Sequence, residues 1–365
     1  MNRPLLIVGA SGRAAAQSAV HAGWQPFIID LFADEDTRSL GPVWQCSLVD
    51  YPQGFIELAA QAPPGPWMYT GGLENYPDVV EAISRTRELF GVRPEVLKTI
   101  RDPFVLQTLV PMPAMCRANE SHDTTKRWLR KPFRGSGGFG IETLRLPASE
   151  SGTAEAEFYS QEWLDAPSYS ALFLFNEHRF PSLIGVCAQL IGEPWLHAPA
   201  FQYCGNIGPI RTDDSMNHRL QELGHLLQPL GLRGLVGIDF LKSGDDLFVL
   251  EVNPRYAASV ELYERALGCS LLREHIQAFQ TSSAHSRFAT EKRDGNIHGK
   301  AVLYAEHSFV VPPLHPWRGP SFADIPMVGS TISAGQPVVT LFASGDTETE
   351  CRERLQDLAR VSEPQ

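Results

Sequence analysis

The chain has 365 residues, of which 43% are hydrophobic, and a formal net charge of −11 at pH 7. This length suggests two to three domains with enough apolar residues for real cores. The negative charge argues against a nucleic-acid partner, which would need a basic patch. The sequence has no uninterrupted run of about 18 apolar residues, so we expect no membrane-spanning helix. The first apolar run is too short for a signal peptide.

The six cysteines are scattered along the chain without a Cys-x-x-Cys pair. This usage is typical of reduced thiols and gives no zinc-binding pattern. We therefore expect a cytoplasmic protein.

The first 94 residues begin with a βαβ pattern: a strand at 5–8, a glycine turn at 9–12, a helix from Arg13 to about Ala22 and a strand at 26–30. Asp30 ends the second strand, as in dinucleotide-binding folds. The turn lacks the full three-glycine fingerprint, so NAD binding is only one alternative. The loops at 9–12 and 71–74 are either tight turns or part of a substrate site.

A short strand at 127–132 carries Lys131 and leads into a glycine-rich loop at 135–140. Glycines let backbone N–H groups approach phosphate oxygens, and the lysine adds a cation. No Gly-Lys-Ser/Thr closes the loop, so it is not a Walker motif, and a flexible turn is the alternative. The strand predicted at 158–165 either binds an adenine edge through its backbone or is an ordinary sheet strand.

Two apolar strands at 234–241 and 247–253 flank a Ser-Gly-Asp-Asp turn and predict a hairpin. Alternation along the strand puts Glu251 and Asn253 on one side, where Asp239 meets them from the neighbouring strand. Two carboxylates and an amide oxygen suit magnesium, although a solvated hairpin face has the same alternation. Arg255 follows directly and offers a fixed cation to an anionic substrate or intermediate.

In this order, the motifs resemble those of the ATP-grasp superfamily, and within it the carboxylate–amine ligases and biotin-carboxylase-like enzymes. The family pattern is a lysine before a flexible glycine loop, a Gln-Glu hinge strand, an acid on one strand and Glu-x-Asn-x-Arg. Its counterparts here are Lys131 with loop 135–140, Gln161-Glu162, Asp239 and Glu251-Val252-Asn253-Pro254-Arg255.

The resemblance spans the chain and implies an α/β (α+β) fold of three parts. These are a Rossmann-like pre-ATP-grasp domain over 1–94, an ATP-grasp domain over 95–280 with a mobile lid at about 111–165, and a small β-rich C-terminal cap over 281–365. From the residues themselves we also predict a loop at 203–209 facing the cleft, helices at 216–230, 261–279 and 348–358, and a linker at 280–296.

The resemblance also implies roles for single residues. Asp239, Glu251 and Asn253 would bind Mg²⁺ or Mn²⁺, and Arg255 would be the catalytic residue that stabilises an acyl phosphate or the substrate carboxylate. The ATP-binding residues would be Lys131, Gly135, Ser136, Gly137, Gly138, Glu162, Trp163, Leu164 and Asp165. In many members, the lysine of an Asp-Lys pair contacts the nucleotide. This chain has Arg101-Asp102-Pro103 at that place, so Arg101 or Lys98 makes the nucleotide contact, or the contact is absent. The residue that would bind the ribose, in the stretch after the hinge, stays open.

The activity implied is an ADP-forming ligation, in which ATP activates a carboxylate as an acyl phosphate and an amine then displaces phosphate. The partners would be a small-molecule acid and amine, and a homodimer is one expectation. Similar carboligases suggest amino-acid ligation in the biosynthesis of one-carbon cofactors of the methanopterin or methanofuran type. Two alternatives remain: a bicarbonate-activating carboxylase and a non-catalytic ATP-binding regulatory module.

Overall fold

A computed structural model describes residues 3–117, 120–145, 157–177, 179–280 and 295–363. The predicted linker at 280–296 lies almost wholly outside these ranges. None of the helices within them has the length and apolar character needed to cross a membrane.

The N-terminal part is a four-stranded parallel sheet in the order β3-β2-β1-β4. Alternate residues of β1 belong to different apolar clusters, because a parallel sheet is covered on both faces. This confirms the βαβ pattern predicted from the sequence. The elements are β1 (Arg3–Val8), α1 (Arg13–His21), β2 (Trp24–Asp30), α2 (Glu35–Leu40), β3 (Val43–Gln45), α3 (Gly54–Gln61), β4 (Trp67–Tyr69), the 3₁₀ turn η1 (Leu73–Asn75) and α4 (Pro77–Ser84).

Two short helices lead to a four-stranded antiparallel sheet in the order β5-β8-β6-β7. The predicted lysine strand and hinge strand are neighbours in this sheet, since β6 pairs with β8. The elements are α5 (Pro94–Ile100), α6 (Pro103–Leu106), β5 (Met115–Arg117), β6 (Trp128–Pro132), β7 (Glu142–Leu144) and β8 (Phe158–Glu162).

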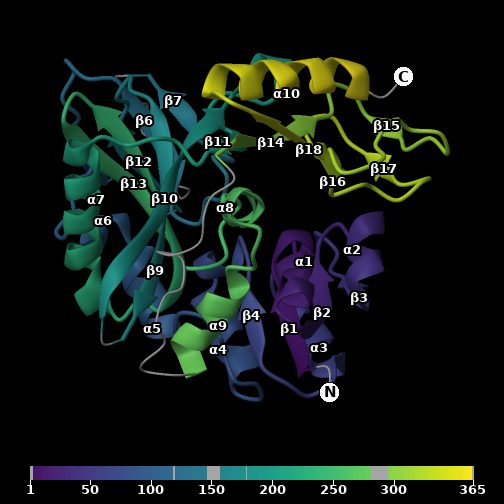
Figure 1. Cartoon of the computed structure of the whole chain (residues 1–365). Coiled ribbons are helices and arrows are strands. Elements are labelled where there is room, and N and C mark those ends of the chain that lie inside the picture. Colours follow the sequence, from purple (N-terminus) through teal and green to yellow (C-terminus); the bar gives the residue numbers. More distant parts are fainter. Residues whose placement is uncertain (1–2, 118–119, 146–156, 178, 281–294, 364–365) are drawn as a thin grey trace.

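The largest sheet has eight strands in the order β13-β12-β9-β10-β11-β14-β18-β16. Its last three strands come from the C-terminal part of the chain: β14 pairs with β11, β18 with β14, and β16 with β18. In Figure 1 the sheet runs from the teal strands at the left to the yellow-green strands beneath α10. Its strands are β9 (Ser168–Asn176), β10 (Arg179–Ile191), β11 (Tyr203–Gly208), β12 (Gly234–Ser243), β13 (Asp246–Asn253), β14 (Ile297–Tyr304), β16 (Phe322–Ala323) and β18 (Pro337–Gly345).

Helices cover this sheet and join it to the N-terminal part. In Figure 1, α7 lies on the outer side of the sheet, whereas α8 and α9 lie between the sheet and α1. One apolar cluster runs from Val8 of the N-terminal sheet to Phe173 and Val236 of the large sheet, so the two sheets share a core. The remaining elements are η3 (Pro194–Leu196), α7 (Asp214–Leu227), η4 (Gln228–Leu230), α8 (Val260–Leu267), α9 (Leu272–Gln280), β15 (Phe309–Val310), β17 (Thr331–Ile332) and α10 (Glu348–Ser362).

Two sequence predictions about elements are wrong. The single helix expected at 261–279 is two helices, α8 and α9, because Gly268 follows α8 in a left-handed conformation with φ of 66° and stops it. The segment expected as a loop at 203–209 contains strand β11, which pairs with β10 and β14. The two glycines at 205 and 208 are typical of loops, but the segment is a strand between β10 and β14 in the large sheet.

Candidate functional site

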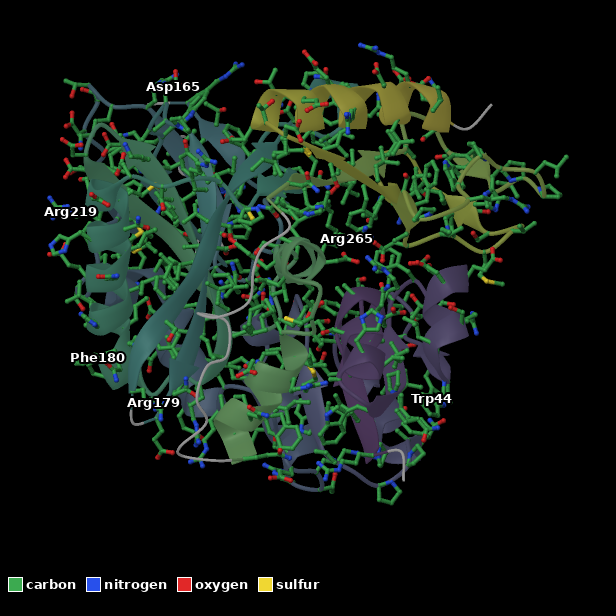
Figure 2. All side chains as sticks on the ribbon, in the orientation of Figure 1. Trp44, Asp165, Arg179, Phe180, Arg219 and Arg265 are labelled. Carbon is green, nitrogen blue, oxygen red and sulfur yellow. The ribbon has the colours of Figure 1, made fainter. Side chains whose placement is uncertain are left out.

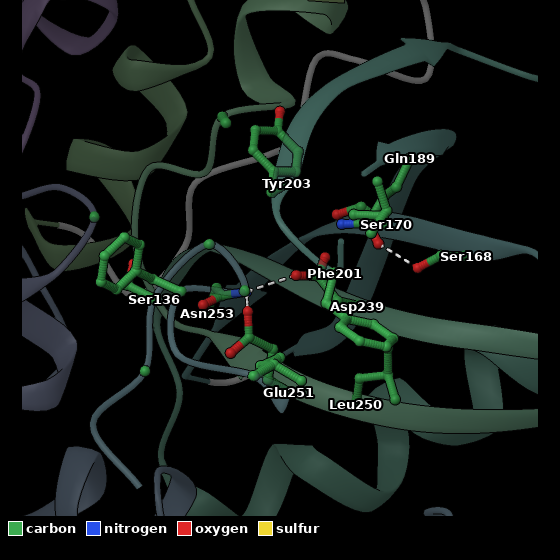
Figure 3. A pocket seen from close by; sticks show the side chains of 18 of the residues that line it. Ser136, Ser168, Ser170, Gln189, Phe201, Tyr203, Asp239, Leu250, Glu251 and Asn253 are labelled. Carbon is green, nitrogen blue, oxygen red and sulfur yellow. Dashed lines mark hydrogen bonds between the residues drawn. The ribbon is translucent and has the colours of Figure 1, made fainter. Parts of the chain in front are cut away.

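The β12–β13 hairpin brings the three predicted metal ligands together. Asp239 is the register partner of Glu251, and Gly237 that of Asn253. The Asn253 side-chain nitrogen donates to Asp239 Oδ2 at 3.0 Å and to Glu251 Oε1 at 3.1 Å, as the dashed lines in Figure 3 show. Glu251 and Asn253 therefore point to the same side of the strand, as predicted.

The two carboxylates strongly influence each other. Burial and the nearby charge of Glu251 raise the pKa of Asp239 to about 7. Burial would also raise the pKa of Glu251, but the charges of Arg101 and Lys131 outweigh it and lower that pKa. Arg101 contacts Glu251 directly, with Nη1 at 3.2 Å from Oε2. Glu251 thus makes an ion pair with Arg101, whereas Asp239 makes none among the described residues.

Lys131 extends from β6 toward the neighbouring strand β8. Its Nζ donates to Gln161 Oε1 at 2.9 Å. Both residues line the main cavity of the structure, which has a volume of about 620 Å³. Gln161 is 1% exposed, and its side-chain nitrogen has no hydrogen-bond partner among the described residues. The lysine is held in place by a neutral amide rather than by a carboxylate, so its positive charge remains available to an anion.

Arg255 is held by an acid from the N-terminal part of the chain. Its Nε and Nη2 both donate to Glu74 Oε1, at 3.0 and 2.9 Å, and Nη2 also lies 3.3 Å from Asn253 Oδ1. Glu74 is 1% exposed and belongs to η1, so the guanidinium is fixed between two parts of the fold. Glu74 was singled out in the sequence only as part of a candidate substrate loop.

The glycine loop is packed against two other parts of the chain. A Cβ on Gly138, whose φ is 78°, would lie 1.9 Å from the carbonyl oxygen of Phe201, so only glycine fits there. The Tyr203 amide donates to the carbonyl oxygen of Gly137 at 2.9 Å. On the other side, Asn75 donates to the Gly135 carbonyl at 3.1 Å. The loop thus closes over one side of the cavity.

The hinge follows β8 into an extended segment. Glu162 is paired with Lys126 at 2.9 Å, and the Arg127 guanidinium lies 4.1 Å from the centre of the Trp163 ring. The Asp165 side chain is 87% exposed and lies 3.8 Å from Arg127. Figure 2 shows Asp165 at the periphery of the molecule.

One cavity of about 620 Å³ collects most of the predicted site residues. Lys98 and Asp165 do not line it, and Lys98 instead borders a neighbouring cavity of about 440 Å³ together with Glu74. Lining a cavity shows where a residue lies but not what it binds, so the roles of the individual residues stay predictions. The predicted residues that do line the main cavity are Arg101, Lys131, Gly135, Ser136, Gly137, Gly138, Glu162, Trp163, Leu164, Asp239, Glu251, Asn253 and Arg255.

The sequence reasoning missed several residues of this cavity. Ser168 and Ser170 of β9 alternate with apolar residues, a signal that could have placed them on the face of the hairpin acids; Figure 3 shows them beside Asp239. Ser259 and Lys300 also line the cavity, but nothing in their local pattern distinguishes them. Only the packing of distant segments brings those two residues to the site.

Residues 103–259 match the family model described as the ATP-grasp domain. An uncharacterized protein of Methanocaldococcus jannaschii is 23% identical over 220 residues, which cover 60% of this chain and 51% of that relative. The chain is thus aligned with only about half the length of this curated relative.

Two solved structures have similar folds. An L-amino acid ligase from Bacillus licheniformis superposes with a TM-score of 0.75 at 13% identity, covering 99% of this chain and 98% of that one. A biotin carboxylase from Campylobacter jejuni, described as a beta-gamma-ATP complex, superposes with a TM-score of 0.73 at 12% identity, covering 96% and 89%.

Residues 103–259 therefore form an ATP-grasp domain, and the whole chain shares its fold with the two solved structures. This confirms the resemblance seen in the sequence motifs and the mixed α/β fold class. At these identities, the similarity to the two solved structures establishes the fold alone.

Proposed function

We propose that the protein is an ATP- and magnesium-dependent ligase that activates a substrate carboxylate as an acyl phosphate for attack by an amine. One observation carries the proposal: a single cavity in an ATP-grasp fold brings together the acids of the hairpin, Lys131, the closed glycine loop and Arg255. Phosphoryl transfer needs positioning and charge neutralisation more than a covalent nucleophile, and this cavity supplies cations, backbone N–H groups and metal-type ligands.

The hairpin residues fit a divalent cation. Asp239 and Glu251 are hard oxygen ligands; burial and their mutual repulsion raise the pKa of Asp239, and a bound cation would offset both causes. The Asn253 amide lies between both carboxylates, and a rotation of its side chain would present its oxygen there instead. Asp239, Glu251 and Asn253 would hold Mg²⁺, which would neutralise charge on the ATP phosphates.

The remaining residues have roles that follow from their positions. Lys131 would bind phosphate oxygens with a charge that no carboxylate in the described part of the chain contacts. The backbone of loop 135–138 would cover the phosphates and exclude water, which would protect an acyl phosphate from hydrolysis. Arg255, fixed by Glu74, would face the transferring group or the substrate carboxylate.

The test is ATP consumption by the purified full chain with Mg²⁺, screened against pooled carboxylic acids and amines, with products identified by mass. We expect ADP, phosphate and a new amide, each dependent on both substrates. Failure of the chain to bind MgATP would overturn the proposal.

A bicarbonate-activating carboxylase is the second candidate, favoured by the fold similarity to biotin carboxylase. It predicts ADP formation with bicarbonate alone and no need for a larger acid. Tight MgATP binding without turnover under any condition would instead favour the regulatory module. Amino-acid ligation in methanopterin- or methanofuran-type biosynthesis is the finest form of our proposal, and the mass of the amide product would test it directly.

A further inference from the structure

The main cavity continues beyond the hairpin acids to the first turn of α1 and the start of α8. The N-terminal part of the chain lines this end with Ser11, Ala14 and Ala15. The start of α8 and strand β14 line it with Ser259 and Lys300. We propose that this end of the cavity binds a second anionic group of the non-nucleotide substrate, a carboxylate or a phosphate monoester that is distinct from the carboxylate being activated. The inference rests on the ligase function proposed above.

The first supporting feature is the open N-terminus of α1. Gly12 precedes the helix and no side chain caps it, so the amides of its first turn have no intrahelical acceptor. The Gly12 amide itself is already bonded to Asp30 Oδ2 at 3.2 Å, so the following residues are the free donors. Ala14 and Ala15 lie in this turn and line the cavity. Such a terminus carries partial positive charge and favours an anion.

The second feature is independent of the helix. Ser259 immediately precedes α8, is 2% exposed and lines the same cavity, yet its Oγ has no hydrogen-bond partner among the described residues. A buried hydroxyl without a partner is unfavourable. An anion bound at this end of the cavity would accept a hydrogen bond from it.

The third feature is a buried cation. Lys300 comes from β14, is 7% exposed, and its Nζ donates to Glu261 Oε2 at 2.9 Å. Glu261 is also bonded through both oxygens by Arg13, so Lys300 is not the only group that neutralises it. An ammonium group has three donors, and among the described residues one of them has an acceptor.

The same contacts explain why these donors converge. Arg13 is the first residue of α1, and Glu261 is the second residue of α8 and follows Ser259 by two positions. The Arg13–Glu261–Lys300 cluster therefore ties both helix starts and β14 to one point. The resulting substrate class is an acid or amine that carries a further anionic group, such as a dicarboxylate or a phosphorylated small molecule.

The experiment is isothermal titration calorimetry of the full chain, without nucleotide, against inorganic phosphate and against succinate at constant ionic strength. We expect the wild type to bind at least one of them. Lys300→Met should weaken that binding at least tenfold, and Ser259→Ala about threefold. A preference for phosphate would point to a phosphorylated substrate, and a preference for succinate to a dicarboxylate.

A second variant keeps the test valid if Lys300→Met folds poorly. Ala14→Glu adds a negative charge that suits a helix start, so the fold is kept while the anion is repelled, and binding should be lost. Ser215→Glu makes the same type of change in the exposed first turn of α7, on the far side of the molecule in Figure 1, and should leave binding unchanged within twofold.

Absence of binding by the wild type, or wild-type affinity in both Ala14→Glu and Lys300→Met, would overturn the inference. Wild-type affinity in both variants would mean that the anion occupies the nucleotide side of the cavity. MgATP binding is titrated separately. If the wild type does not bind MgATP, the proposed ligase function is refuted, and the result of the anion titration can still be interpreted.

Discussion

Two clusters of charged residues in this fold use the same residue types with different balance. In the hairpin cluster, Glu251 makes an ion pair with Arg101, whereas Asp239 makes none among the described residues. In the junction cluster, each of three acids has a cation partner: Arg13 contacts Glu261, Asp324 and Asp36, and Lys300 contacts Glu261. An unbalanced cluster in a cavity, in which an acid lacks an ion pair, suggests a cation site, whereas a balanced cluster between segments, in which every acid has one, suggests a structural connection.

The largest effect should come from breaking the balanced cluster. Arg13→Met would leave the buried Glu261 and the partly buried Asp324 with less positive charge, and we expect the free energy of unfolding to fall by about 3–5 kcal/mol. Urea unfolding measures this. Arg85→Met, which removes an exposed pair with Glu81, is the control and should change stability by at most about 0.5 kcal/mol. Similar losses in both variants would contradict the structural role of the junction.

A change in the unbalanced hairpin cluster should lower activity rather than stability. Glu251→Ala, alone or with Asn253→Ala, should lower Mg²⁺-dependent turnover by about 10²–10³-fold, because charge on the phosphates would no longer be neutralised. The melting temperature should hardly change, since the repulsion with Asp239 is removed as well. Asp246→Ala, at the exposed start of the same strand, is the matched control. Normal turnover in folded Glu251→Ala would refute the metal assignment.

A smaller effect should follow from releasing Arg255. Glu74→Gln keeps an acceptor for the guanidinium but removes the charge that fixes it, and we expect kcat to fall by about 10- to 100-fold. The KM for ATP should stay near its wild-type value, because Glu74 does not line the main cavity. Glu81→Gln, a change of a largely exposed side chain on α4, is the control. A change in KM alone would show that Glu74 acts on binding rather than on Arg255.

The smallest effect concerns an acid that the junction does not neutralise. Burial and the charges of Asp324, Asp30 and Asp36 raise the pKa of Asp34 to about 8. The folded protein then holds a proton that the unfolded chain has already released, so this contribution to stability is present below about pH 4 and is lost as pH rises through 8.

Asp34→Asn imitates the protonated acid and should flatten this decline. Each unit of pKa shift is worth about 1.4 kcal/mol, so we expect the variant to be at least about 1.4 kcal/mol more stable than wild type at pH 8, and little changed at pH 4. Thermal unfolding at both pH values provides the measurement. Equal effects at the two pH values would show that Asp34 is already ionised in the folded protein.

Local patterns predicted much of the site because its key residues lie close together in sequence or in regular elements. Alternation along one strand was enough to place Glu251 beside Asn253, and a short turn was enough to bring Asp239 opposite Glu251. The pairing of β6 with β8 had no such signal, because 30 positions separate Lys131 from Gln161 and no local pattern sets the register of the two strands.

Other contacts could not be predicted, because they join segments that no local pattern relates. Glu74 reaches Arg255 across 181 positions, and Arg13 reaches Glu261 across 248. Strand β14, through which the C-terminal strands join the large sheet, likewise pairs with β11 across a long stretch of chain. Gly268 also shows that periodicity alone misplaces a boundary when one residue takes a left-handed conformation.

The sequence by itself determined the class of the protein, the hairpin of acids and the lysine with its glycine loop, because turns, alternation and residue chemistry act over short distances. Only the tertiary structure decided which acid fixes Arg255, why Lys300 and Ser259 border the cavity, and that Asp165 lies outside it. Those features depend on how sheets and helices from distant parts of the chain share one core, and burial, not local pattern, sets that arrangement.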